Sequence, residues 1–203
     1  MITQELPAVP TIVAQGITVG PVPATDVEAH AGQVTLVSVE GGQRADFLAL
    51  MLSGRMTPKA GVVELDGKED PKGLRSRVAI VDAPDTSAPA DELPLASVIR
   101  EELVFAGLRG PKQATRKLLA DEGLSDLAGT PIGEIPAAAR IRVLARTAAA
   151  HPDVDILVIA TPDRHGGDTA AWYDTAHAWA ARGYTVIVLA SAATIAHVSD
   201  KFA

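Results

Sequence analysis

Residues 31–67 read AGQVTLVSVEGGQRADFLALMLSGRMTPKAGVVELDG, and the rest of the architecture can be built outward from them. A β-branched run at 34–39 enters a turn at Gly41 and Gly42, and a helix is predicted to begin at about Ala45. Strand, glycine loop and helix in this order form the arrangement in which backbone N–H groups at a helix N-terminus surround phosphate. The sequence therefore predicts a loop with the backbone layout of a phosphate-binding loop.

The side chains that would complete such a loop are missing. Working loops place Lys and then Ser or Thr at the helix start, where they neutralise phosphate charge and hold Mg²⁺. Here these positions hold Ala45 and Asp46, and the single cation, Arg44, stands between Glu40 and Asp46. We expect weak nucleotide binding or none at this degenerate loop, which comprises Gly41, Gly42, Gln43, Arg44, Ala45 and Asp46.

Asp46 has two possible structural roles at the start of this helix. A carboxylate there is stabilised by the free N–H groups and the helix dipole. Asp46 or Glu40 would close the loop on itself in the place of phosphate, or Asp46 would act as an ordinary helix cap. Both roles predict poor nucleotide binding.

Segments along nearly the whole chain resemble ATP-binding cassette (ABC) ATPases in order and spacing. The resemblance rests on VEAHAGQVTLVSVEGG, LMLSGRMTPKAGVVELDG, RSRVAIVDAP, LPLASVIREELVFAGL, RVLARTAAAHPDVDILVIATPD and ARGYTVIVLASAA. It implies an α/β fold with a P-loop NTPase-like, mostly parallel sheet flanked by helices, a small helical subdomain and an N-terminal β portion. It also implies a single domain over 1–203, with 1–83 and 141–203 as the α/β core and 84–140 as the helical subdomain.

The residue pattern supports this architecture independently of the resemblance. β-Branched runs at 34–39, 77–81, 155–160 and 184–190 predict buried strands of a sheet covered on both faces. A helix is predicted over 168–182, with an Asp168 cap, and Trp172, Ala176 and Trp179 share its sheet-facing side. Two further helices are predicted over 95–108 and 111–122, and a short one around 124–127.

The positions that carry catalysis in ABC ATPases hold other residues here. By this resemblance the Q-loop glutamine falls at Ala83, the Walker B acidic residues at Ala160 and Thr161, and the switch histidine at Ser191. The signature motif falls at Ile135, Pro136, Ala137, Ala138 and Ala139, and no aromatic side chain stands at 18–23 to stack on adenine. The resemblance therefore implies no catalytic residue, no metal ligand and no resident cofactor, with weak ATP binding still allowed.

The function implied by the resemblance is that of a catalytically inactive pseudo-ATPase. It would serve as a structural or regulatory subunit of a membrane transport or export complex. Its partner would be a permease-like membrane protein, another ABC subunit or a second copy of itself. A groove of the helical subdomain would receive the permease. Two alternatives stay open, namely a nucleotide or anion sensor without hydrolysis, and an enzyme of unrelated chemistry.

The composition of the chain argues against several other classes of protein. The 203 residues carry a net charge of −7 and no cysteine, which argues against nucleic-acid partners and excludes disulfides and thiol chemistry. Residues 1–10 lack a signal-peptide pattern, and no apolar run approaches the ~18 residues needed to cross a bilayer. We expect a cytoplasmic protein that reaches the inner face of the membrane only through a partner.

The remaining polar residues give weak signals. The five histidines do not cluster, and 163–168 (DRHGGD) falls where ABC ATPases have their D-loop, so a structural role is expected there. Arg142 and Arg146 lie one helical turn apart with Arg140 nearby, which predicts ion pairs on the surface of a helix.

Overall fold

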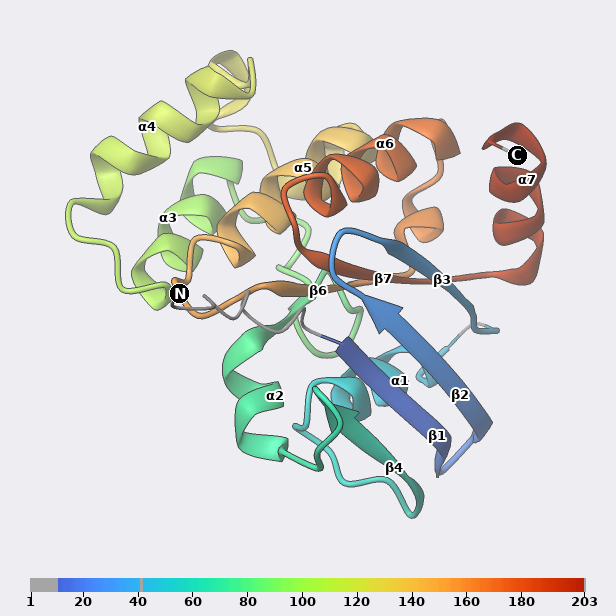
Figure 1. Ribbon diagram of the computed structural model, residues 1–203. Helices are drawn as coiled ribbons and strands as arrows, with labels where there is room; N and C mark the ends of the chain where they lie inside the picture. Colours follow the sequence, from blue (N-terminus) through green and yellow to red (C-terminus); the bar gives the residue numbers. More distant parts are fainter. Residues whose placement is uncertain (1–10, 41, 203) are drawn as a thin grey trace, which may run out of the picture.

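A computed structural model describes residues 11–40 and 42–202 (Figure 1). The strands are β1 (Thr11–Val19), β2 (Val22–His30), β3 (Val34–Ser38), β4 (Ala60–Leu65), β5 (Val78–Val81), β6 (Ile156–Ala160) and β7 (Thr185–Ala190). The α-helices are α1 (Arg44–Leu52), α2 (Pro71–Arg77), α3 (Leu95–Phe105), α4 (Pro111–Asp121), α5 (Ala137–Ala148), α6 (Thr169–Ala180) and α7 (Ala192–Phe202). Three short 3₁₀ helices complete the described chain: η1 (Ser125–Leu127), η2 (Ile132–Glu134) and η3 (Pro162–His165).

The centre of the molecule is a parallel sheet with the strand order β3-β7-β6-β5. Every residue of β6 and β7 is buried, as expected for strands covered on both faces. Successive side chains point to opposite faces, so Val158 and Ile187 enter one core while Leu157 and Val186 enter the other. Because the strands are parallel, their carboxyl ends meet at one edge of the sheet, where loops from distant parts of the sequence converge.

The two faces of the parallel sheet are covered differently (Figure 1). One face packs on α5 and α6, whose buried side chains include Ile141, Leu144 and Trp172. The other face packs on α1 and on the antiparallel sheet β2-β1-β4, through residues such as Leu48 and Ile12. The expected α/β fold with an N-terminal β portion is confirmed.

Between β5 and α5 the chain forms a helical region that projects from the sheet. Helices α3 and α4 contact each other and lie together beyond the end of the sheet (Figure 1). The side chains of Leu95, Val98, Ile99 and Leu103 form the predicted buried stripe of α3. Helix α3 ends at Phe105 rather than at 108, because Gly107 adopts a positive φ of 78° that stops the helix.

The predicted strands all form, with bounds within a residue or two of expectation. Helix α6 begins after Asp168, whose Oδ1 accepts a 3.0 Å hydrogen bond from the Ala170 N–H, and the chain turns at Gly183 with φ 94°. Trp172 and Trp179 are 1% and 9% exposed and belong to the core, as predicted. Within the described residues, none of the helices combines the length and the apolar character needed to cross a membrane.

Candidate functional site

A cavity of about 390 Å³ opens at the carboxyl ends of the parallel strands. Its walls come from the loop after β3, the start of α1, the segment after β5, η3 and the turn after β7. The lining residues are Val39, Gly42, Gln43, Asp46, Pro84, Asp85, Thr161, Asp163, Arg164 and Ser191. Part of the glycine loop, Thr161 and Ser191, which lie far apart in the sequence, therefore line one cavity.

The glycine loop has the predicted strand–loop–helix layout. Gly42 adopts a φ of 74°, which only glycine takes without strain, and α1 begins directly afterwards at Arg44. The residue before the helix is Gln43, whose side chain makes no capping hydrogen bond. The lining of the cavity includes Gly42, Gln43 and Asp46 but not Arg44, and Gly41 lies outside the described residues. The cation counted from the sequence therefore does not contribute to the cavity wall.

Asp46 shows neither the loop closure nor the helix capping expected for it. Asp46 is 4% exposed, and its Oδ1 accepts a 3.0 Å hydrogen bond from the N–H of Asp85, in the segment that follows β5. Its Oδ2 is buried and has no hydrogen-bond partner. The carboxylate thus contacts the segment after β5, which the tertiary fold brings beside the start of α1.

Asp82 forms an ionic network that the sequence analysis missed. It follows β5 directly, has a positive φ of 58° and carries a fully buried side chain. Arg140 donates to both carboxylate oxygens, at 2.9 Å from Nη2 to Oδ1 and 3.1 Å from Nε to Oδ2. Arg164 Nη2 lies 3.0 Å from Oδ1, and His165 Nε2 lies 2.7 Å from Oδ2. This network joins the end of β5 to α5 and to η3.

Arg140 was expected at the surface with Arg142 and Arg146, and that expectation is wrong. Its side chain is 1% exposed, and besides Asp82 it contacts Asp91 Oδ1 at 3.0 Å and donates to the Ile132 carbonyl at 3.3 Å. At 3.6 residues per turn, Arg140 lies about 200° around α5 from Arg142 and about 240° from Arg146, so the helical period itself places it on the side that faces the end of β5. A carboxylate directly after a buried strand was the available signal that an arginine would be drawn inward.

The other two arginines behave as predicted. Arg142 Nε pairs with Glu122 at 3.0 Å, and Arg146 contacts Glu122 at 2.7 Å and Asp121 at 2.6 Å. These pairs hold α5 against the end of α4 at a partly exposed surface.

The pKa of Asp82 predicts how stability depends on acid. Burial opposes its charged form, yet the hydrogen bonds from His165 and Arg140 and the charges of Arg140 and Arg164 outweigh burial and hold the pKa below its ordinary value. A depressed folded-state pKa contributes stability that is present above the unfolded-state pKa, about 3.9, and is lost as pH falls below it. We expect the free energy of unfolding, measured in urea between pH 5 and pH 3, to fall.

The surface carboxylates provide the control for this acid effect. The pKa values of Asp121 and Glu122 are also lowered by their arginine and lysine partners, although burial opposes the shift at Glu122. The double variant Asp121→Asn/Glu122→Gln removes their part and should retain most of the acid-induced loss. A flat profile in that variant would assign the acid sensitivity to the surface pairs and not to Asp82.

The far wall of the cavity consists of hydroxyl and carboxylate groups. Asp163 Oδ2 accepts hydrogen bonds from the Ser191 N–H at 3.1 Å and from Thr194 Oγ1 at 2.9 Å. Thr161 has a φ of 45°, which is unusual for a β-branched residue, and its buried Oγ1 has no hydrogen-bond partner. Two buried oxygen atoms without partners, Asp46 Oδ2 and Thr161 Oγ1, therefore belong to residues that line the same cavity.

The remaining positions implied by the resemblance do not line this cavity. Ala83 is buried and its N–H donates to Ser87 Oγ at 3.0 Å. Ala160 ends β6 in the core, and the segment 135–139 leads into α5, which begins at Ala137. Among the described residues, no three His, Asp or Glu side chains are grouped closely enough to hold a metal ion.

A second concave surface lies between the helical region and the edge strand β5. This groove has a volume of about 500 Å³. Its wall residues come from β5, the end of α3, the end of α5 and the segments beside them, and they include Arg75, Ala79, Ile80, Glu102, Ala106 and His151. Near it, at the end of α3, Val104 and Phe105 are 53% and 73% exposed. These two side chains follow one another directly before Ala106, which lines the groove.

Known structures place this architecture among the ATP-binding subunits of ABC transporters. The structure is similar to an ATP-binding subunit of an ABC transporter, with a TM-score of 0.61 and 16% sequence identity over 93% of this chain and 82% of that chain. It is equally similar to cbiO1 from Clostridium perfringens, part of the ABC transporter complex cbiONQ, with a TM-score of 0.61 and 16% identity over 89% of this chain and 77% of that chain. At this identity the likeness shows the fold.

The sequence itself matches no family model and no curated protein. The chain therefore has the fold of ABC transporter ATP-binding subunits, and its cavity lies where the glycine loop, the end of β6 and the turn after β7 meet.

Proposed function

We propose that this chain is a catalytically inactive, ABC-type pseudo-ATPase that serves as a structural or regulatory subunit of a membrane transport complex. The observation that carries the proposal is the charge of the cavity. Three carboxylates line it, Asp46, Asp85 and Asp163, together with one arginine, Arg164, which is already paired with Asp82. A phosphate-bearing ligand needs cations at this place, and the cavity offers it unpaired anions.

The fold supports the transport setting. ABC ATP-binding subunits are the structural neighbours of this chain, and one of these neighbours is part of a transporter complex. We infer a cytoplasmic subunit that associates with a permease-like membrane protein, with another ABC subunit or with a second copy of itself. In this arrangement the chain contributes its shape and its contact surfaces rather than ATP hydrolysis.

Titration with ATP tests the loss of nucleotide binding. We expect no heat of binding for the wild-type protein up to millimolar ATP, with or without Mg²⁺, because the carboxylates of the cavity repel the phosphates. The variant Ala45→Lys/Asp46→Ser restores the two missing side chains and is the matched control; measurable ATP binding by this variant would locate the defect at the loop. Binding of ATP by the wild-type protein would contradict the proposal. If that binding were independent of Mg²⁺, a nucleotide sensor would replace the pseudo-ATPase.

The groove between α3 and β5 is the proposed surface for the membrane partner. Ala106 lies in its wall at the end of α3, so the long charged side chain of Ala106→Arg would fill it. We expect this variant to reduce recovery of a polytopic membrane protein from detergent-solubilised membranes at least tenfold, as measured by quantitative mass spectrometry.

The control for the groove is an equal substitution outside it. Ala120 is exposed on α4, and Ala120→Arg should leave the recovery unchanged. If both variants retained the partner equally, the groove would not be the docking surface.

A further inference from the structure

The cavity at the carboxyl ends of the strands has an unbalanced charge that points to a ligand. Asp46, Asp85 and Asp163 line it, and the described structure pairs none of these three carboxylates with a cationic side chain. The two arginines of the Asp82 network are already paired with other carboxylates: Arg140 pairs with Asp82 and Asp91, and Arg164 pairs with Asp82. The carboxylates of the cavity are therefore not needed to neutralise the arginines of the network.

Asp46 provides a second, independent observation. Its side chain is 4% exposed, and burying a charged oxygen without a partner costs free energy. One oxygen receives the Asp85 N–H, while Oδ2 has no partner. Thr161 Oγ1 is a further buried oxygen without a partner in the same lining. An ionised Asp46 carboxylate only accepts hydrogen bonds, and the Thr161 hydroxyl can accept one as well as donate one, so a hydrogen-bond donor can satisfy both groups.

The chemistry of the walls selects the kind of donor. The described carboxylates do not form a cluster with metal-ligand spacing, which favours a longer organic cation over a single metal ion. Val39 and Pro84 provide apolar surface between the polar groups, against which a methylene chain can lie. A primary ammonium group carries three N–H donors and no acceptor, so it matches carboxylate and hydroxyl oxygens.

We propose that this cavity binds a small alkylammonium compound of the diamine class, with an ammonium group held between Asp46 and Asp163. Thr161 Oγ1 accepts a further hydrogen bond from it, and Asp85 adds negative charge at the mouth. The site thus prefers a cation, whereas a nucleotide site with the same arrangement of strands and loop binds the anionic phosphates. It rests on the proposed function only in requiring that nucleotide does not occupy the cavity.

Titration with putrescine, followed by calorimetry at low ionic strength, tests the proposal. We expect saturable binding by the wild-type protein and none of the uncharged analogue 1,4-butanediol. Asp163→Asn and Asp46→Asn should each weaken putrescine binding at least tenfold, because each removes a charge-assisted hydrogen bond. Raising the salt concentration should weaken binding as well.

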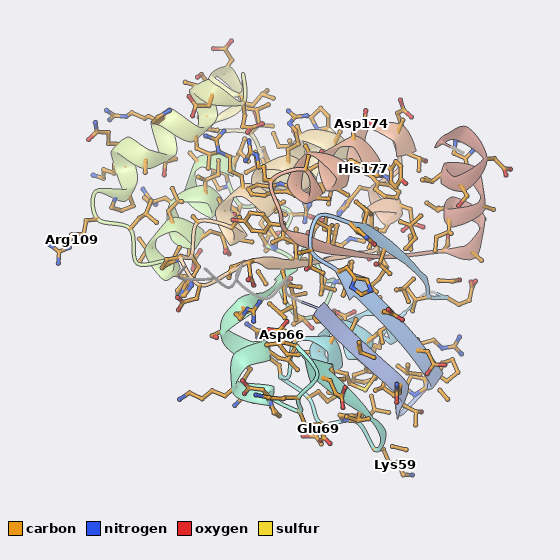
Figure 2. All side chains as sticks on the ribbon, viewed as in Figure 1. Lys59, Asp66, Glu69, Arg109, Asp174 and His177 are labelled. Atoms are coloured by element: carbon orange, nitrogen blue, oxygen red, sulfur yellow. The ribbon has the colours of Figure 1, made fainter. Side chains whose placement is uncertain are left out.

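Two further variants keep the test decisive. Asp85 is exposed, so Asp85→Asn is expected to fold normally and to weaken binding even if Asp46→Asn proves unstable. Asp174, labelled in Figure 2, is an exposed carboxylate on α6 that does not line the cavity, and Asp174→Asn should bind as the wild-type protein does.

Several outcomes would overturn the inference. They are the absence of putrescine binding at millimolar ligand, equal binding by all variants, and displacement of putrescine by Mg²⁺ at the same carboxylates. The result with ATP separates this inference from the proposed function. If neither ATP nor putrescine binds, the inference fails while the pseudo-ATPase stands. If ATP binds and displaces putrescine, nucleotide occupies the cavity, and both the inference and the pseudo-ATPase proposal fail.

Discussion

Replacing Arg140 with Met is expected to lower the free energy of unfolding by about 3–5 kcal/mol. Arg140 is 1% exposed and donates to both oxygens of Asp82, whose side chain is fully buried. Removing the guanidinium leaves a buried carboxylate with less compensation, and it also removes the donor to the Ile132 carbonyl. The loss should fall toward the lower end of this range, because Arg164 and His165 still contact Asp82. Urea denaturation monitored by circular dichroism measures it.

The matched control for this substitution lies on the same helix. Arg146 pairs with Glu122 and Asp121 at a partly exposed surface, so Arg146→Met should cost less than about 1 kcal/mol. The double variant Asp82→Asn/Arg140→Met should be more stable than the sum of the single losses predicts, because it removes both buried charges. An Arg140→Met loss as small as that of Arg146→Met would show that the network contributes little.

A loss of about 3–5 kcal/mol is also expected for Trp172→Ala. Trp172 is 1% exposed on α6 and packs into the core between that helix and the parallel sheet. Apart from Trp172 and Trp179, the buried cluster that includes Trp172 consists of aliphatic side chains, and a close-packed core relaxes only partly into the space that a removed ring leaves. The substitution should lower the midpoint of urea unfolding, with the unfolding slope unchanged.

Phe105→Ala is the control for the loss of an aromatic ring. Phe105 lies at the end of α3 and is 73% exposed, so its removal should change stability by no more than about 0.5 kcal/mol. If Trp172→Ala lowered the free energy of unfolding no more than Phe105→Ala does, the core between α6 and the parallel sheet would have to repack around the missing ring.

The parts of the fold that the sequence predicted are those with strong local signals. β6 and β7 are short continuous runs of β-branched and aliphatic residues, a pattern that predicts buried strands. Helix α6 begins with a capping aspartate and is followed by a glycine, so its ends were predictable as well. The end of α3 was predicted three residues too late, because the apolar pattern was continued to Leu108 past Gly107, the glycine that ends the helix.

The candidate site was predictable only in its layout. The glycine loop, Thr161 and Ser191 were identified from the order of the segments, and the structure brings them to one cavity. The partners of Asp46 and Asp82 were not identified, because they lie tens of residues away along the chain. The helical period separates Arg140 from Arg142 and Arg146, but it does not show that a carboxylate 58 residues away would receive the Arg140 side chain.

The sequence by itself determined the four strands of the parallel sheet, several of the helices, the absence of the usual phosphate-binding side chains and the aliphatic character of the core. These properties depend on residue type and on short-range periodicity, and both can be read from the sequence alone. Only the tertiary structure decided that Asp82, Arg140, Arg164 and His165 neutralise one another, and that the carboxylates of the cavity stay unpaired. Charge pairing acts over a few ångströms in space, and the crossovers of a parallel sheet set which distant residues come within that range.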